Sequence, residues 1–293
     1  MTAPSTTGPE STILIKTFER PWAVRRCLAS LAATGWTGPV MVLDDSRTSC
    51  RKVTDKLALP FELRLVETEY NIGTSAGRNR LLELTDTPYF FLFDDDFVCT
   101  PELFRPAFML QVLTEHKLDI LAGRVVDRID PFWAFVDAYG RKNILRGLFS
   151  SGFADTARTL MRRKKERIFF GNFRERDKTM HVDFFEPETS LVRCDLVCNF
   201  FVAKTESVQG MNGWDKDLTP YEHNDFFLRA KKAGLQVAAT REAGILHRRH
   251  PSLTQILANP FSHARYRANR YVDLGEIRQR YLSKFGLRDW ENF

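Results

Sequence analysis

The sequence predicts an α/β fold in which a mostly parallel central sheet is flanked by helices. Apolar runs rich in β-branched and aromatic residues alternate with helical patterns between residues 12 and 126, which is typical of a parallel sheet covered on both faces. Two of these runs end in clustered aspartates. Because ligands of such sheets bind beyond the carboxyl ends of the strands, we expect the functional site at these acidic ends.

The expected elements of the first half follow one another in order. The apolar runs predict strands at residues 12–18, 40–46, 61–67, 88–97 and 119–126. Helices are expected from Pro21 onward, after the Gly-rich turn that opens residues 71–84, and from Pro101 to His116. The pattern therefore predicts a covered parallel sheet for this half of the chain.

The second half is less regular. Residues 141–181 are basic and lack a clean period, and their run RRKKER (162–167) predicts either a solvated helix or loop, or a contact with anionic lipid or an anionic acceptor. The remaining expected elements are a strand at 197–205, a Gly-Trp loop with an amphipathic helix over 210–234, short strands at 236–240 and 243–247, and one or two helices over 251–293.

This order predicts one large domain and a C-terminal extension. We expect a catalytic domain over residues 1–250, with a nucleotide-binding half at 10–126 and an acceptor half at 127–250. Residues 251–293 are expected to form a C-terminal helical arm.

The charge and the cysteines limit the class of protein. With 43 Lys and Arg against 37 Asp and Glu the net charge is +6, and the five cysteines are odd in number with no tight CxxC pair. A disulfide framework and a structural zinc site are therefore not expected. The first residues lack a secretory signal and no run of about 18 apolar residues occurs. We expect a cytoplasmic protein, with a peripheral position at the inner face of the membrane as a further hypothesis.

The acids of LFDDDFV carry the clearest chemical signal. Asp94, Asp95 and Asp96 follow a very apolar strand, and three carboxylates there repel one another unless a cation or ligand is present. Oxygen ligands suit Mg²⁺ or Mn²⁺. Alternate residues of an extended chain point the same way, so Asp94 and Asp96 are expected to face one site. The alternative is a solvated acidic turn.

Four weaker signals each have a structural alternative. Gly73 and Gly77 open a helix with Arg78 behind them, which suits a phosphate or a plain turn. Glu222 and Asp225 lie on one helix face and suit a general base or a helix-dipole pair. His247 is expected to be either a metal ligand or a structural histidine. Trp214 is expected either to form an apolar floor for the sugar or to anchor its loop in the core.

Together these residues resemble a family. In order, the chain carries R/P-x-x-x-R-x-x-L (20–28), a VLDDS strand end (42–46), N-x-G-x-x-x-G-R-N (71–79), a DxD motif (94–96), and a late acid helix followed by a histidine. Over residues 10–250 this resembles glycosyltransferases of the Rossmann-like GT-A fold, broadly glycosyltransferase family 2. Within this group the sequence is most similar to β1,4-N-acetylgalactosaminyltransferases of the ganglioside-synthase type, in the segments IKTFERP, DDDFV, VCNFFVAKT and HNDFFL.

The resemblance implies roles at the donor site. Asp94 to Asp96 would hold a metal ion and the donor's diphosphate, with Asp96 the most direct ligand and His247 completing the metal site. The residues implied in donor binding are Thr17, Arg20, Asp45, Arg78, Asp94 and Asp95. To these we add Trp214 as an apolar floor for the sugar.

The resemblance also implies a general base on the acid helix. Asp225, before Phe226 and Phe227, matches the ganglioside-type pattern and is the first choice, with Glu222 second. His223 and Asn224 replace acids of the related β1,4-galactosyltransferase pattern, so both carboxylates stay candidates.

The function implied is that of a metal-dependent inverting glycosyltransferase. It would use Mn²⁺ or Mg²⁺ and move GalNAc, GlcNAc, Gal or GlcA from a UDP-sugar to a hydroxyl of a glycan or glycolipid, in surface polysaccharide synthesis. The alternatives are a nucleotidyltransferase acting on sugar phosphates and a non-catalytic carbohydrate-binding relative. An anionic membrane surface is a further partner, and nucleic acid is not expected.

Overall fold

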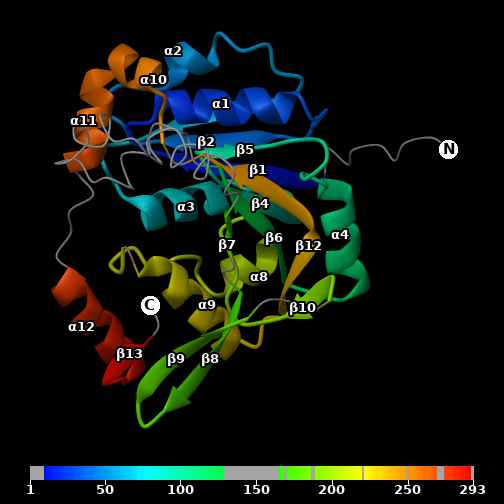
Figure 1. The fold of residues 1–293 in the computed structure, drawn as a ribbon, viewed down its shortest axis with the longest axis vertical. Coiled ribbons are helices and arrows are strands. Elements are labelled where there is room, and N and C mark those ends of the chain that lie inside the picture. The colour runs from blue at the N-terminus through cyan, green and yellow to red at the C-terminus, as the bar shows by residue number, and fades with distance from the viewer. Residues whose placement is uncertain are drawn as a thin grey trace, which may run out of the picture.

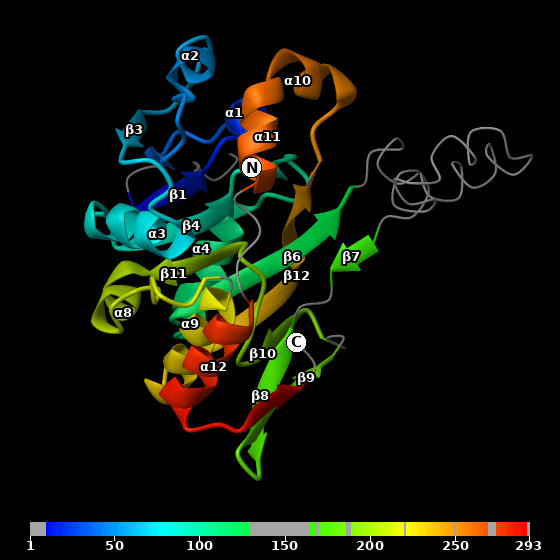
Figure 2. The ribbon, with the colours of Figure 1, turned by 90° about the vertical axis from the view of Figure 1, so that its left-hand side faces the viewer.

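The computed structural model describes residues 10–128, 165–167, 170–185, 189–219, 221–248, 250–268 and 274–291. Within these residues a ten-stranded sheet forms the centre, and a three-stranded sheet lies beside it (Figures 1 and 2). The predicted α/β class is confirmed. The basic run at 162–167 lies outside the described residues except for its last three positions.

The central sheet has the strand order β10-β12-β6-β11-β4-β1-β2-β3, with β5 paired to β12 and β7 to β6. Its strands are β1 (Ser11–Thr17), β2 (Val40–Asp44), β3 (Leu63–Glu67), β4 (Tyr89–Asp94), β5 (Phe97–Val98), β6 (Ile120–Asp127), β7 (Lys165–Arg167), β10 (Leu191–Arg193), β11 (Phe201–Lys204) and β12 (Val237–His247). The pairs β4–β1, β1–β2, β2–β3 and β6–β12 are parallel, whereas β11 runs antiparallel between β4 and β6.

Helices cover both faces of this sheet, as the two core clusters show. The described helices are α1 (Pro21–Ala32), α2 (Arg51–Thr54), α3 (Thr74–Glu83), α4 (Pro106–Glu115), α8 (Thr205–Gly210), α9 (Glu222–Lys232), α10 (Leu253–Ala258), α11 (Pro260–Ala268) and α12 (Leu274–Phe285). Apolar residues of α1 and α4 belong to one core cluster, and those of α3, α8, α9 and α12 belong to the other. The phenylalanines pack in this core: the rings of Phe93, Phe104 and Phe200 lie 5.5–6.3 Å apart.

Local sequence explains where the helices that position the site begin. Proline stands in the first turn of α1 and of α4, where its missing N–H costs no hydrogen bond. Gly73 precedes α3 with φ of 92°, a conformation that L side chains rarely adopt. Acids in the first turn of α9 and bases in its last turn complement the helix dipole.

Two expectations differ from the structure. The helix expected from Pro101 begins at Pro106, because residues 101–103 form a turn. The strands expected at 236–240 and 243–247 are one strand, β12, with an irregular register between Thr240 and Gly244.

The basic middle contains a hairpin that its composition did not predict. It consists of β8 (Gly171–Arg176) and β9 (Thr179–Phe184), and the C-terminal β13 (Asp289–Glu291) pairs with β9 in parallel. The C-terminal segment therefore contributes a strand as well as helices.

Candidate functional site

The acidic strand ends come together as expected for parallel strands. Thr17 at the end of β1 pairs in register with Asp44 at the end of β2, and Lys16 pairs with Asp94 at the end of β4. Asp45 follows β2 directly. The carboxyl ends of three neighbouring strands thus form one polar edge, which we call the donor edge.

Two of the aspartates after β4 bind one arginine at this edge. Asp95 is fully buried; it accepts a hydrogen bond from the Thr17 hydroxyl at 2.6 Å and pairs with the guanidinium of Arg20. Arg20 Nη1 also lies 2.8 Å from Asp96 Oδ2, and the ring of Tyr266 lies 4.8 Å from the guanidinium carbon. Burial and the charge of Asp96 raise the pKa of Asp95 to about 6, although Arg20 opposes the shift.

Asp96 also faces a buried histidine. Its Oδ1 accepts no hydrogen bond of good geometry and lies 3.2 Å from Nε2 of His247, whose Nδ1 lies 2.5 Å from Asp127 Oδ1. Burial would raise the pKa of Asp96, but Arg20 and His247 outweigh burial and hold it below its usual value. That effect of His247 requires a proton on Nε2; in the neutral tautomer that donates from Nδ1 to Asp127, Nε2 instead has a lone pair available to a cation.

This donor set fits a hard divalent cation. A carboxylate oxygen and an imidazole nitrogen face each other, and a second carboxylate orients the imidazole. Mg²⁺ is usually held by one or two carboxylates together with substrate phosphates, so two protein ligands suffice. No group of three or more His, Cys, Asp or Glu side chains suited to a metal occurs among the described residues, and Asp94 is not part of this pair.

Asp94 points to a different set of partners than Asp96, which corrects the expectation that both face one site. The chain turns at 95–96 instead of staying extended. Asp94 Oδ1 lies 3.0 Å from Nη2 of Arg78, which is buried, and Oδ2 lies 3.4 Å from Nδ2 of Asn199.

Trp214 is a core anchor, not a floor for the sugar. It is 2% exposed, and its ring stacks on Phe226 with centroids 4.6 Å apart. Asn79 holds the Trp214 backbone by donating to its carbonyl oxygen and accepting from its N–H, both at 2.7 Å. The guanidinium of Arg78 lies 5.7 Å from the indole. The buried Trp214 ring therefore lies next to the Arg78 guanidinium and helps to position it.

Asp45 binds a lysine that sequence reasoning missed. Lys16 Nζ lies 2.5 Å from Asp45 Oδ1, and the N–H of Gly73 donates to Oδ2 at 3.2 Å. Burial lowers the pKa of Lys16 and raises that of Asp45, while each partially offsets the other's shift. A Cβ at Gly77 would lie 2.8 Å from Lys16 Cγ, so Gly77 lets α3 approach β1 here. The alternation of side-chain direction along β1 was the sequence signal that could have indicated the position of Lys16.

Asp225, the first choice for the general base, has both carboxylate oxygens in ion pairs. It is fully buried, with Oδ2 2.7 Å from Arg229 Nε and Oδ1 2.5 Å from Lys284 Nζ. Arg229 also donates to the carbonyl oxygens of Met211 and Gly213. Asp225 thus forms the centre of a buried ion-pair cluster with Arg229 and Lys284, which we call the hub. This corrects the prediction that Asp225 is a better candidate for the general base than Glu222.

Glu222 has the surroundings that a general base requires. Its Oε2 is shielded from solvent and has no hydrogen-bond partner. Burial raises the pKa of Glu222, Arg78 opposes the rise, and the charge of Asp94 adds to it. Arg78 and Asp94 of the donor edge, together with Asp225, are thus charged side chains that act on Glu222.

The neighbouring His223 is an unsuitable base. Burial and the charge of Arg78 lower its pKa to about 3. Its Nε2 lies 2.8 Å from the Val197 carbonyl oxygen and its Nδ1 lies 2.8 Å from Asn199 Oδ1. His223 therefore positions Asn199, which contacts Asp94.

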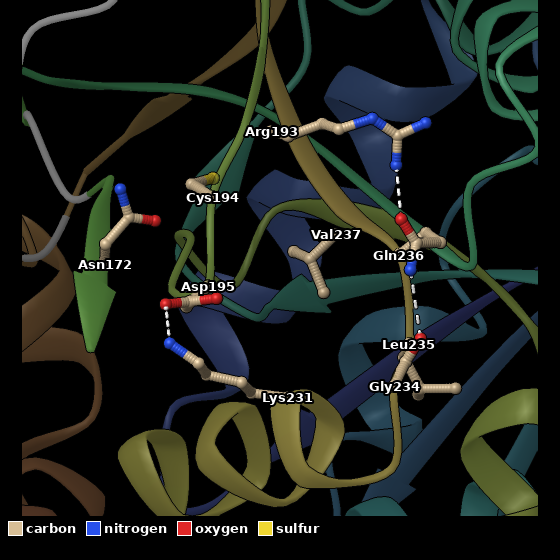
Figure 3. Close-up of a pocket in the computed structure, with 9 residues that line it drawn as sticks. All are labelled: Asn172, Arg193, Cys194, Asp195, Lys231, Gly234, Leu235, Gln236 and Val237. Atoms are coloured by element: carbon tan, nitrogen blue, oxygen red, sulfur yellow. Dashed lines mark hydrogen bonds and ion pairs between the residues drawn. The ribbon is translucent and has the colours of Figure 1, made fainter. Parts of the chain in front are cut away.

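A pocket of about 330 Å³ lies away from the donor edge (Figure 3). It is formed at the start of β12 and the end of α9, and its lining residues are Asn172, Arg193, Cys194, Asp195, Lys231, Gly234, Leu235, Gln236 and Val237. Lys231 pairs with Asp195 at 2.6 Å, and Arg193 donates to Gln236 at 2.5 Å. Within the pocket Lys231 and Asp195 offset each other's charge, whereas Arg193 is bound by an uncharged amide oxygen.

Comparison with known proteins agrees with this geometry. The model of glycosyl transferase family 2 matches residues 12–185. Beta-1,4 N-acetylgalactosaminyltransferase 1 of Rattus norvegicus is 26% identical over 279 residues, and that of Mus musculus is 27% identical over 280 residues. Each alignment covers 94% of this chain and 46% of the relative, so the chain spans about half the length of these relatives.

Solved structures share the fold. The structure of S. aureus TarS 1-349 in complex with UDP-GlcNAc has a TM-score of 0.57 at 14% identity, covering 92% of this chain and 64% of that one. The predicted GT-A fold is thereby confirmed. Among the described residues, the helices are all too short or too polar to cross a bilayer.

Proposed function

Because this chain belongs to glycosyl transferase family 2, we propose that it transfers a sugar from a UDP-sugar to a hydroxyl of a glycan or glycolipid. The observation that carries the proposal is Glu222, a half-buried residue whose Oε2 is shielded and has no hydrogen-bond partner, and on which the charges of Arg78 and Asp94 at the donor edge act. Family membership disfavours a sugar-phosphate nucleotidyltransferase and a non-catalytic relative.

The donor is proposed to lie along the donor edge. Asp45, held by Lys16 and the Gly73 N–H, is placed to bind the base. Arg20 and Arg78 are the cations closest to the aspartates of the DxD motif and are proposed to bind the diphosphate. The relatives' names support this assignment, since one solved neighbour binds UDP-GlcNAc and the curated relatives are N-acetylgalactosaminyltransferases.

Asp96 and His247 are proposed to hold Mn²⁺ or Mg²⁺, with Asp127 orienting the imidazole. A bound divalent ion supplies positive charge that offsets the charge growing on the leaving diphosphate. Asp95, fully buried and hydrogen-bonded to Thr17, keeps Arg20 at the edge and is proposed to act as a support for the site.

Asp127→Asn tests the metal assignment through binding. We expect it to weaken Mn²⁺ affinity about 10–100-fold, because loss of the carboxylate that hydrogen-bonds a metal-ligating histidine typically has an effect of that size. Calorimetric titration with Mn²⁺ and UDP measures the change without any turnover. The matched control is Asp55→Asn, an exposed aspartate outside the site, and equal affinities for both variants would contradict the assignment.

Glu222 is proposed as the general base. It accepts the proton of the acceptor hydroxyl while that oxygen forms a bond to the anomeric carbon. The bond from the anomeric carbon to the diphosphate oxygen breaks, and its electron pair leaves with UDP. Attack opposite the leaving group inverts the configuration at the anomeric carbon.

The function is tested by UDP release. UDP-GalNAc, UDP-GlcNAc, UDP-Gal and UDP-GlcA are offered with and without Mn²⁺, and slow hydrolysis with water as acceptor serves as the first readout. We expect UDP release from one of these donors and stimulation by Mn²⁺. If every donor stays intact and UDP leaves the melting temperature unchanged, the proposed function is wrong.

Several broader assignments stay proposals. We propose that residues 251–293 form an arm added to a domain over 1–250, and that the product enters surface polysaccharide synthesis. A reducing, cytoplasmic environment is supported by the cysteines, because all five are free and buried.

A further inference from the structure

The turn between β1 and α1 contains a residue in a strained backbone conformation. It consists of residues 18–20, between the end of β1 and Pro21 at the start of α1, and we call it the Glu19 turn. Glu19 has φ of 54°, in the left-handed region that a residue with a Cβ rarely adopts. Arg20 follows directly, so the direction in which its side chain leaves the turn depends on the conformation of Glu19.

The side chain of Glu19 is a buried anion at this turn. Its carboxylate oxygens lie 2.6 and 2.9 Å from Nε and Nη2 of Arg265 in α11. The backbone N–H of Arg47 donates to Oε1 at 3.0 Å, and the N–H of Glu19 itself donates to the Ser46 hydroxyl at 2.6 Å. Among the described residues, Arg265 is the only cation paired with this carboxylate. A buried charge is costly unless it is paired, so α11 supplies the charge that keeps Glu19 inside.

The same helix also contacts Arg20. The ring of Tyr266 lies 4.8 Å from the guanidinium carbon of Arg20, a distance at which an aromatic ring attracts a cation. The guanidinium in turn pairs with Asp95 and Asp96. Two consecutive residues of α11 thus bind two consecutive residues of the Glu19 turn, and Figure 2 shows α11 beside β1 and α1.

We propose that Arg265 is a positioning residue for the nucleotide site, on which it acts through Glu19. This inference rests on the proposed function, in which Arg20 binds the diphosphate of the donor. With Arg265 in place, the neutralised Glu19 stays buried in the left-handed conformation, and Arg20 points to the aspartates of the DxD motif. Without Arg265, the unpaired carboxylate turns toward water, the Glu19 turn relaxes to an ordinary conformation, and Arg20 leaves its place.

The alternative is that Arg265 only fastens α11 to the domain. That role predicts a loss of stability without any change in the affinity of the folded protein for UDP. A helix anchor does not require a strained residue next to the nucleotide site, whereas a positioning contact explains one, because such strain persists where the surrounding structure holds it. The left-handed φ of Glu19 therefore favours the positioning role.

Calorimetry with UDP tests the proposal on the full chain. Arg265→Met is expected to bind UDP about tenfold more weakly than wild type, since the left-handed conformation is disfavoured on that scale for a residue with a Cβ. Arg265→Lys keeps the charge without the two-nitrogen contact and is expected to have an intermediate affinity. In the double variant Glu19→Gly/Arg265→Met no carboxylate is left buried and glycine adopts the left-handed conformation without strain, so we expect an affinity close to that of wild type.

The matched control is Arg280→Met, which removes an arginine of α12 that pairs with Glu276 on the surface and is expected to leave UDP affinity unchanged. Chemical denaturation of each variant checks that it is folded. If Arg265→Met does not fold, the same comparison is made with Arg265→Lys alone and combined with Glu19→Gly.

Two results would overturn this inference alone. One is wild-type affinity for UDP in the folded Arg265 variant, and the other is a double variant that binds UDP as weakly as the Arg265 variant. A wild-type protein that binds no UDP would instead overturn the proposed function, and this inference with it.

Discussion

The Glu222→Gln enzyme is expected to turn over its donor about 10²–10⁴-fold more slowly than wild type, with unchanged affinity for UDP. Glutamine keeps the shape of the side chain but does not take up the proton of the acceptor hydroxyl. Glu222 is the acid of α9 whose carboxylate has an oxygen without a partner, so the substitution breaks no ion pair. Steady-state kinetics with the active donor and calorimetry with UDP measure the two effects.

The matched control is Glu206→Gln. Glu206 also lies in the first turn of a helix, α8, but its side chain is exposed, and we expect wild-type turnover. Turnover of Glu222→Gln close to wild type would place the base elsewhere.

The pH profile gives the same prediction an independent readout. Burial raises the pKa of Glu222 above its ordinary value of 4.5, against the opposing charge of Arg78. A base acts only when ionised, so kcat/KM is expected to fall with decreasing pH through a pKa higher than that of an ordinary glutamate. The residual activity of Glu222→Gln is expected to lack this acidic limb.

Asp225→Ala is expected to lower the free energy of unfolding by about 1–3 kcal/mol, because Arg229 and Lys284 lose their buried anion. The loss is limited, since Lys284 keeps Asp215 and Arg229 keeps two carbonyl oxygens as partners. Asp225 is fully buried, and it joins α9 to α12 through the 2.5 Å contact with Lys284. Chemical denaturation measures the loss. The fraction that stays folded is expected to bind UDP, since the donor edge lies outside this hub.

A surface pair is the control for this change. Arg80 and Glu83 are 3.0 Å apart with side chains 54% and 62% exposed, and Glu83→Ala is expected to change stability by less than about 1 kcal/mol. If Asp225→Ala lowers the free energy of unfolding no more than Glu83→Ala does, the ion pairs of Asp225 do not stabilise the fold. Asp225→Asn with normal stability and abolished turnover would restore Asp225 as the base.

The strands of the donor edge were predictable because their signal is local. Apolar runs at 12–18, 40–46 and 88–97 end in polar residues, and parallel strands bring such ends together. The divergence of Asp94 and Asp96 was not predictable in this way, because the turn after β4 decides it.

One partner of Asp225 lies 59 positions away, at Lys284. The other partner, Arg229, lies four positions after Asp225, and this i,i+4 spacing was a local signal that favoured an ion pair for Asp225. Trp214 was ambiguous, because Phe226, which stacks on it, belongs to another element. Long-range contacts therefore decided the roles that the motif left open.

The bond between Arg265 and Glu19 joins positions 246 residues apart. During synthesis Arg265 is added 246 residues after Glu19, the carboxylate that it neutralises. The first strands are able to pair before then, because β1 and β2 are close in sequence, but the loop that carries Arg20 is completed only with α11. We therefore expect the nascent chain to pair its first strands well before it acquires the capacity to bind a nucleotide.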